Sequence, residues 1–166
     1  ALEYITNKKT DDFNELASYL QNGYRILTLA KIENQFNKET NQVIAFVIIK
    51  DNIRQNAKDT IEYFKKQNVS IKIISGDNPI TVSNLLKQLE IENYDKYISG
   101  TDLPNNYEEL KEIINNYMIF GRVTPDQKQM IIKGLKENNT VGMIGDGVND
   151  ILALRESDCS IALASE

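Results

Sequence analysis

The chain has 166 residues, of which 41% are hydrophobic, and its 24 acidic against 19 basic residues give a formal net charge of −5. This length fits one domain, or one domain and part of another, and the hydrophobic share supports a packed core rather than a disordered tail. The acidic balance argues against nucleic-acid binding, which requires a basic face. The sequence has no histidine, which excludes Ser-His and Cys-His nucleophile pairs and most zinc sites. Catalysis would therefore depend on carboxylates, lysine, hydroxyls and backbone amides.

The single cysteine and the apolar runs restrict the compartment. Cys159 cannot form an internal disulfide and fits a reducing environment, and its apolar neighbours predict a packed, unreactive thiol. The longest apolar run, residues 43–49, is far shorter than the roughly 20 residues that span a bilayer. No amino-terminal stretch resembles a signal peptide. Taken alone, the chain is predicted to be soluble.

The first part of the chain predicts a helix and two strands. Apolar residues recur at helical spacing over residues 10–22, and Gly23 is expected to end that helix. Residues 24–32 are rich in β-forming side chains, and the polar residues 33–41 predict a turn. Residues 42–49 predict a fully buried strand.

From residue 51 onwards, predicted strands and helices alternate. This alternation predicts an α/β fold, with a parallel sheet covered by helices on both faces. The predicted helices are residues 55–67, 79–89, 107–116, 125–138 and 151–156, and the predicted strands are residues 69–74, 97–99, 118–122, 140–144 and 159–164.

A Gly-Asp-Gly-Val-Asn-Asp segment at residues 145–150 directly follows a predicted buried strand. It puts a carboxylate at the carboxyl edge of the sheet, where open α/β sheets bind ligands. The glycines permit a tight turn and the close approach of a ligand. Asp146, Asn149 and Asp150 offer the hard oxygen ligands that Mg²⁺ prefers. The same residues also fit a plain turn with helix caps.

Two further polar positions lie near the starts of predicted helices. Ser75-Gly76-Asp77 ends a strand just before a helix whose amino terminus attracts anions, and the Ser75 hydroxyl can donate to a phosphate oxygen. Lys128 lies in the first turn of a helix, where a cation opposes the helix dipole and requires an anionic partner. A hydroxyl, an ammonium and a metal-binding carboxylate together suit phosphoryl transfer. The alternatives are a turn and cap at residues 75–77 and a solvated surface lysine at 128.

Five segments in fixed order carry a resemblance to a known family. On these segments the chain closely resembles P-type cation-transporting ATPases, which are members of the haloacid dehalogenase superfamily. The last segment is highly specific, and the full series in this order is more so. The segments are Gly-Tyr-Arg-Ile-Leu at 23–27, Asp-Asn-Ile-Arg at 51–54, Ser-Gly-Asp-Asn-Pro at 75–79, Arg-Val-Thr-Pro-Asp-Gln-Lys at 122–128, and residues 145–150 followed by Ala153-Leu154.

The resemblance implies roles in phosphoryl transfer for residues that match the family's motifs. In such ATPases an aspartate within Asp-Lys-Thr-Gly-Thr attacks the γ-phosphate of ATP and forms an aspartyl phosphate. Asp146 would be a Mg²⁺ ligand, with Asn149 and Asp150 supporting the metal and phosphate site. Lys128 would neutralise phosphoryl charge. Ser75 would hold a phosphoryl oxygen, although the family more often has threonine there.

Four other residues receive ligand-binding roles by the same resemblance. Gly76 and Asp77 would contribute to the phosphate site, where Asp77 would help to position Mg²⁺ or the nucleotide phosphates. Arg25 resembles an arginine at the end of the nucleotide-binding insertion and would reach ATP. Arg54 matches an arginine at the hinge between two domains.

The resemblance also implies the fold and the domain organisation. It implies a haloacid-dehalogenase-like Rossmannoid fold of three layers with a mostly parallel sheet. Residues 1–42 would be the end of the nucleotide-binding domain and the hinge, and residues 43–166 would be part of the phosphorylation domain. The chain would be a cytosolic piece that stops before the transmembrane helices.

The sequence contains no Asp-Lys-Thr-Gly-Thr. The sheet is therefore expected to lack its central strand, between the strands that carry Ser75 and Asp146, and the piece alone is expected to be inactive. The implied partners are ATP, the rest of the same polypeptide, and a cation transported through a membrane domain that lies outside this chain. The implied location of the chain is the cytoplasmic face of a bacterial membrane. A soluble haloacid-dehalogenase phosphatase and a non-catalytic Mg²⁺- or nucleotide-binding module remain as alternatives.

Overall fold

The computed structural model describes residues 13–32, 37–39, 41–50 and 53–163. The chain divides into two units, Ala1–Gln55 and Asn56–Glu166, and each is described by itself. Parts of three predicted elements lie outside the described residues. These are residues 10–12 of the first helix, residues 33–36 and 40 of the turn, and residue 164 of the last strand; residues 51–52 of the family resemblance lie outside them as well.

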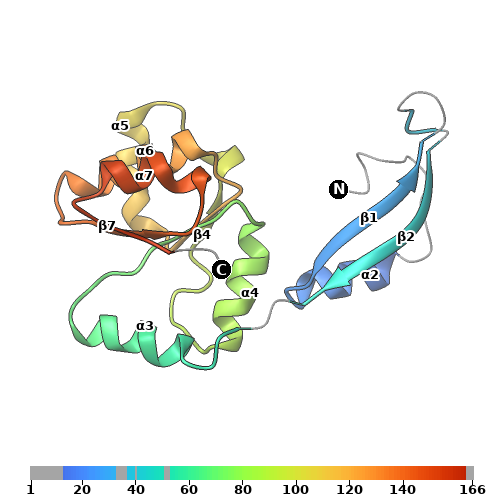
Figure 1. Cartoon of the computed structure of the whole chain (residues 1–166), viewed down its shortest axis with the longest axis horizontal. Coiled ribbons are helices and arrows are strands. Elements are labelled where there is room, and N and C mark those ends of the chain that lie inside the picture. Colours follow the sequence, from blue (N-terminus) through green and yellow to red (C-terminus); the bar gives the residue numbers. More distant parts are fainter. Residues whose placement is uncertain (1–12, 33–36, 40, 51–52, 164–166) are drawn as a thin grey trace. The chain divides into compact units, whose positions relative to one another are not determined.

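The described part of the unit Ala1–Gln55 comprises a helix and an antiparallel hairpin (Figure 1). The helix, α2 (Phe13–Gln21), is followed by β1 (Arg25–Lys31) and β2 (Gln42–Ile49), as predicted. Gly23 has a positive φ of 83°, and its N–H donates to the carbonyl of Leu20 at 3.1 Å. A glycine in this conformation ends a helix without steric cost, so the predicted helix stop is confirmed.

The prediction that β2 is fully buried is wrong. Among the described residues β2 pairs only with β1, and one face of the hairpin is open: Leu27 is 58% exposed and its cross-strand partner Val47 is 51% exposed. An apolar run alone does not distinguish a strand covered on both faces from one covered on a single face. The chain division after Gln55 groups β2 with β1, and the domain boundary expected at residue 42 stays a prediction.

The unit Asn56–Glu166 confirms the predicted alternation of strands and helices, with shorter strands than expected. Where residues 69–74 were predicted to be a strand, only the last two residues pair with a neighbour. The elements are α3 (Ala57–Lys66), β3 (Ile73–Ile74), α4 (Pro79–Gln88), β4 (Tyr97–Ser99), η1 (Gly100–Asp102), α5 (Tyr107–Ile113), η2 (Ile114–Asn116), β5 (Ile119–Gly121), α6 (Pro125–Lys136), β6 (Gly142–Gly145), η3 (Val148–Asp150), α7 (Ile151–Glu156) and β7 (Cys159–Ala162).

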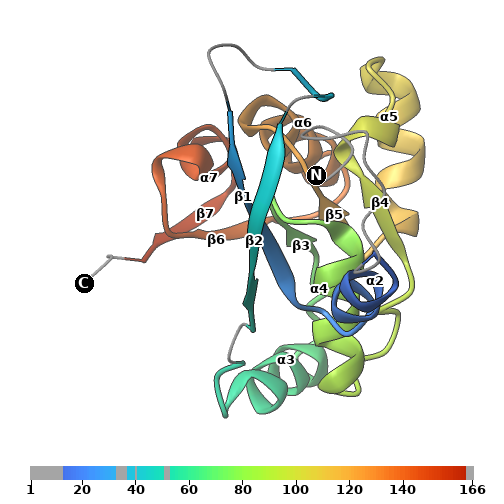
Figure 2. The same cartoon turned by 90° about the vertical axis from the view of Figure 1, so that its right-hand side faces the viewer.

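The strands of this unit form two parallel sheets. One sheet has the order β3-β5-β4, with Ile74 and Ile98 both aligned with Phe120, and the other pairs β6 with β7. All five strands are parallel to their partners, which confirms the predicted α/β class. Figures 1 and 2 show α6 and α7 on one side of the strands and α3 on the other, so the unit has three layers.

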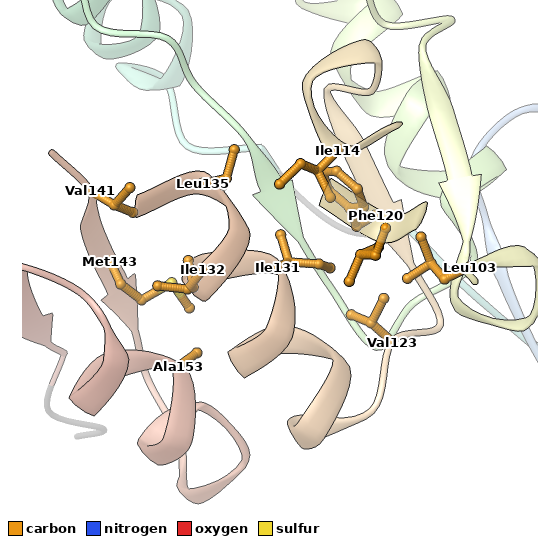
Figure 3. Close-up of a cluster of buried hydrophobic side chains, with 11 residues drawn as sticks. Leu103, Ile114, Phe120, Val123, Ile131, Ile132, Leu135, Val141, Met143 and Ala153 are labelled. Atoms are coloured by element: carbon orange, nitrogen blue, oxygen red, sulfur yellow. The ribbon is translucent and has the colours of Figure 1, made fainter. Parts of the chain in front are cut away.

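Two apolar clusters hold these layers together, one on each face of β5, so that consecutive residues of this strand belong to different clusters. Phe120 belongs to the larger cluster, with residues of α5, α6, α7 and β6, while Ile119 belongs to a smaller cluster with Val82 and Leu86 of α4. Figure 3 shows that Ile131 and Ile132 of α6 lie in the larger cluster between residues of the two sheets. The two sheets therefore share one core through α6.

Two other observations concern the surface of the chain. Cys159 is exposed, so the predicted packed thiol is wrong; the residue lies on β7, which has β6 as its partner on one side. Among the described residues, no helix combines the length and the apolar character needed to cross a bilayer.

A buried isoleucine of α6 provides a test of the shared core. Ile131 is fully buried, so we expect Ile131→Ala to lower the free energy of unfolding by about 2–5 kcal/mol, measured by urea unfolding. The matched control is Ile80→Ala, which changes a helical isoleucine that is 46% exposed and should cost less than about 1 kcal/mol. Equal losses in the two variants would contradict this position of the core.

A carboxylate links the beginnings of β6 and β7. Asp158 Oδ2 accepts a hydrogen bond from Val141 N at 2.8 Å, and Asp158 Oδ1 lies 3.4 Å from Lys136 Nζ. The backbone N–H of Val141, and after it the Lys136 ammonium, lower the pKa of Asp158 below its ordinary value of 3.8.

This lowered pKa predicts a pH dependence of stability. The folded state favours the ionised carboxylate, so the contribution of Asp158 is complete above pH 3.8 and is lost as the pH falls through the folded-state pKa. We expect an NMR titration of the Asp158 side-chain carbon to give a midpoint below 3.8, and Asp158→Ala to unfold with a weaker pH dependence in this acid range. A midpoint at or above 3.8 would show that the hydrogen bond to Val141 is not formed.

Candidate functional site

The polar segments singled out in the sequence follow the carboxyl ends of parallel strands. Ser75 follows β3, residues 122–124 follow β5, and Asp146 follows β6. We call these segments, residues 75–77, 122–124 and 145–150, the polar rim. The carboxyl ends of the strands are the place where α/β sheets bind ligands.

The loop after β3 is bonded to the loop after β5. Ser75 O accepts from Val123 N at 3.3 Å, and Asp77 O accepts from Arg122 N at 2.8 Å. Within the first loop, Ser75 Oγ accepts from Asp77 N at 3.0 Å, which leaves the hydroxyl proton able to reach a ligand. The interpretation of residues 75–77 as a turn is thus correct for the backbone, and it is compatible with a ligand-binding hydroxyl.

Glycine is required at the end of β5 for these loops to meet. A Cβ atom on Gly121 would lie 2.5 Å from Pro79 Cδ at the start of α4. Asn78 caps the same helix, since its Oδ1 accepts from Ile80 N at 3.0 Å. Gly76 has a different role, because a Cβ at this position would meet nothing within 4 Å. Gly76 is exposed, and no described atom of the chain packs against this position.

Lys128 is buried and paired with a carboxylate. It lies in the first turn of α6, whose amino terminus is capped by Thr124, and its Nζ is 2.6 Å from Asp150 Oδ1. The two side chains are only 10% and 11% exposed. The interpretation of Lys128 as a solvated surface lysine is therefore wrong, and the expected anionic partner of this cation is Asp150. Such a pair is stable in a buried place because each charge compensates the other.

The backbone of β6 accommodates the Asp150 carboxylate through a glycine. A Cβ on Gly145 would lie 2.7 Å from Asp150 Cβ and 2.8 Å from Asp150 Oδ2, so any larger residue would displace this side chain. Asp150 N also donates to Gly147 O at 3.0 Å, which closes the tight turn of residues 147–150. Gly145, Asp150 and Lys128 thus form one packed cluster at the end of β6.

Asp146 and Asn149 are next to Gly145 and Asp150 in the sequence, and both are exposed. Among the described residues, no three histidine, cysteine, aspartate or glutamate side chains converge into a metal cage. Mg²⁺ is commonly held by one or two carboxylates together with phosphate oxygens and water, so this donor set fits a Mg²⁺ ion that binds with a phosphorylated ligand. Asp150 was expected to be a metal ligand as well; its Oδ1 is engaged by Lys128, and the expectation stays a prediction.

The two arginines that were predicted to bind ATP lie in the unit Ala1–Gln55. Arg25 begins β1 and Arg54 precedes α3, and both are exposed. Their roles stay predictions.

Sequence reasoning missed two residues that organise the rim. Arg122 has a left-handed backbone with φ of 52°, which is unusual for a side chain other than glycine, and nothing in the sequence signals it. Gln127 completes a capping box with Thr124 and also donates to Gly100 O at 2.8 Å. Its position, three residues after a threonine that precedes proline, is a recognisable capping signature.

Comparisons with known proteins show relatives among cation-transporting ATPases. The chain is 41% identical over 157 residues to a probable cation-transporting ATPase, exp7, of Streptococcus pneumoniae, which covers 90% of this chain and 20% of the relative. It is 38% identical over 148 residues to the calcium-transporting ATPase CtpE of Mycobacterium tuberculosis (86% and 18%), and 30% identical over 169 residues to the magnesium-transporting ATPase, P-type 1, of Salmonella typhimurium (95% and 18%).

The chain spans about a fifth of the length of these curated relatives, at 18–20%. The model of the haloacid dehalogenase-like hydrolases matches residues 5–158. This match covers nearly the whole chain, and it agrees with the three-layer parallel α/β fold. The chain therefore belongs to the haloacid dehalogenase-like hydrolases, as a domain that matches P-type cation-transporting ATPases.

Proposed function

We propose that this chain is the cytosolic phosphorylation portion of an ATP-driven, cation-transporting P-type ATPase. In this proposal it contributes the Mg²⁺- and phosphoryl-binding groups with which an aspartyl phosphate is formed and hydrolysed. The observation that carries the proposal is the buried Lys128–Asp150 pair, 2.6 Å apart, next to the exposed Asp146 at the carboxyl end of a parallel strand. The cation-transporting relatives support the same reading of the whole protein.

Lys128 supplies a fixed positive charge. Lys128 lies near the capped start of α6, and Asp150 holds its ammonium in place, so little reorganisation is needed when negative charge develops on a phosphoryl group. The proposal gives Asp146 and Asn149 to Mg²⁺, which when bound neutralises charge on phosphate oxygens. Ser75 donates its hydroxyl proton to a phosphoryl oxygen. The backbone N–H of Asp77 donates to Ser75 Oγ at 3.0 Å and so orients this hydroxyl.

The attacking carboxylate would come from a further strand between the two sheets. Among the described residues, β3 pairs only with β5 and β6 pairs only with β7, although both sheets share one core. Ile73 and Ser75 donate to carbonyls on the β5 side, so the backbone groups of Ile74 point towards the other edge of β3. An edge of this kind is a template for another strand. A strand that fills it would end at the rim near Ser75 and Asp146.

Phosphoenzyme formation tests this proposal. Incubated with labelled ATP and Mg²⁺, the 166-residue chain is expected to yield no acid-stable, hydroxylamine-labile phosphoprotein, because it has no Asp-Lys-Thr-Gly-Thr aspartate. A longer chain that includes this motif is expected to yield it. In the longer chain, Asp146→Asn and Lys128→Met should reduce the yield by at least about 100-fold, as loss of a preorganised charge does in other active sites.

The matched control for these variants is Asp126→Asn, which removes another exposed aspartate at the start of α6 and should preserve phosphorylation. Labelling of the 166-residue chain itself would overturn the proposal. So would full labelling of the longer chain carrying Asp146→Asn.

The buried pair also makes a prediction about stability. We expect Lys128→Met and Asp150→Asn each to lower the free energy of unfolding by about 3 kcal/mol, since each leaves a buried charge without its partner. The double variant should lose less than the sum of the two, which a double-mutant cycle by urea unfolding measures. Glu92→Gln, at the exposed pair with Lys65, should leave the stability nearly unchanged. Additive losses at Lys128 and Asp150 would contradict a direct pair.

A further inference from the structure

Three hydrogen bonds connect Gln127 to Thr124 and Gly100, and only two of them belong to a capping box. Its N–H donates to Thr124 Oγ1 at 3.2 Å, and its Oε1 accepts from Thr124 N at 3.0 Å. The third bond runs from Nε2 to Gly100 O at 2.8 Å, on the turn η1 that follows β4. Glutamate would complete a capping box equally well, but it has no N–H to donate to a carbonyl. The bond to Gly100 therefore needs the carboxamide of glutamine.

The turn η1 fits closely against the first turn of α6. Gly100 is buried, and a Cβ at this position would lie 2.8 Å from Gln127 Oε1 and would collide with the carbonyl oxygen of Arg122. The turn also carries polar side chains, since Ser99 Oγ lies 2.8 Å from Thr101 Oγ1. Gln127 thus joins the end of β4 to the segment between β5 and α6.

Two residues that the proposed function assigns to the phosphoryl ligand, Lys128 and Ser75, are connected to this start of α6. Lys128 is the next residue after Gln127, and its Nζ lies 2.6 Å from Asp150 Oδ1 in the segment that follows β6. Val123 N bonds to Ser75 O, which ties the serine loop to this segment as well. A displacement of the first turn of α6 would therefore move Lys128 relative to both Ser75 and Asp150.

We propose that Gln127 is a positioning residue: its carboxamide anchors the first turn of α6 to Gly100 and thereby holds Lys128 against Asp150. The importance of this anchor for phosphoryl transfer rests on the proposed function, whereas the anchor itself is a property of the fold. A cap with a purely stabilising role would work equally well with glutamate, and this difference makes the proposal testable.

Competitive labelling of lysines with acetic anhydride, read by peptide mass spectrometry, measures the anchor in the 166-residue chain. In Gln127→Glu we expect Lys128 to be acetylated several-fold faster than in the unchanged chain. Lys72, whose Nζ donates to three backbone carbonyls at 2.6–3.2 Å, reports global opening and should keep its rate. Gln127→Met, which adds no negative charge, should give the same result.

The matched control is Gln129→Met, which repeats the uncharged substitution two residues further along α6, where the amide donates to Glu156 Oε2 at 3.3 Å rather than to the turn η1. It should leave the labelling of Lys128 unchanged. An unchanged rate for Lys128 in both Gln127 variants would overturn the proposal, and so would a rise at Lys72 equal to that at Lys128.

A second readout separates this inference from the proposed function. In the longer chain with the Asp-Lys-Thr-Gly-Thr motif, Gln127→Glu should lower the maximal rate of phosphoenzyme formation several-fold and leave the half-saturating ATP concentration unchanged. If that longer chain forms no phosphoenzyme even without substitution, the proposed function fails while the labelling result still decides the role of Gln127. A lower rate caused only by weaker ATP binding would overturn the positioning role.

Discussion

The arrangement of the polar rim depends on one buried ion pair. Lys128 comes from α6 and Asp150 from the loop after β6, so their contact at 2.6 Å fixes the spacing between a helix start and a strand end. Neither charge is stable in this place without the other, because desolvation opposes both. Gly145 makes the pairing possible by leaving room for the carboxylate. The positive charge of the site is thus set by packing before any ligand arrives.

Charge and backbone geometry reinforce each other around this pair. The close contact of Gly121 with Pro79 joins the end of β5 to the helix that follows β3, and Gln127 joins the capped start of α6 to Gly100 after β4. Arg122, between β5 and α6, has a left-handed backbone. Conformations of this kind persist only where the surrounding structure holds them, and they are common at functional sites. Asp146 and Asn149 differ from the buried Lys128 and Asp150, since both lie at the surface of this framework.

Much of the fold could be predicted from the sequence, because the helical and strand periods are strong from residue 57 onwards. The need of Lys128 for an anion was also predictable from its place in a helix's first turn. The identity of that anion was not, since Asp150 lies 22 residues away and the pairing depends on how α6 packs. The burial of β2 and of Cys159 was misjudged for a related reason: an apolar run does not reveal how many neighbours a strand has.

The position of α6 between the two sheets has a consequence for how the chain unfolds. Ile131 and Ile132 share one cluster with Phe120 of one sheet and Met143 of the other, so the two sheets have part of their apolar core in common. Loosening either sheet exposes apolar surface of the other through this helix. Opening of the β6-β7 sheet therefore also removes packing from the sheet β3-β5-β4, although among the described residues no backbone hydrogen bond links the two sheets.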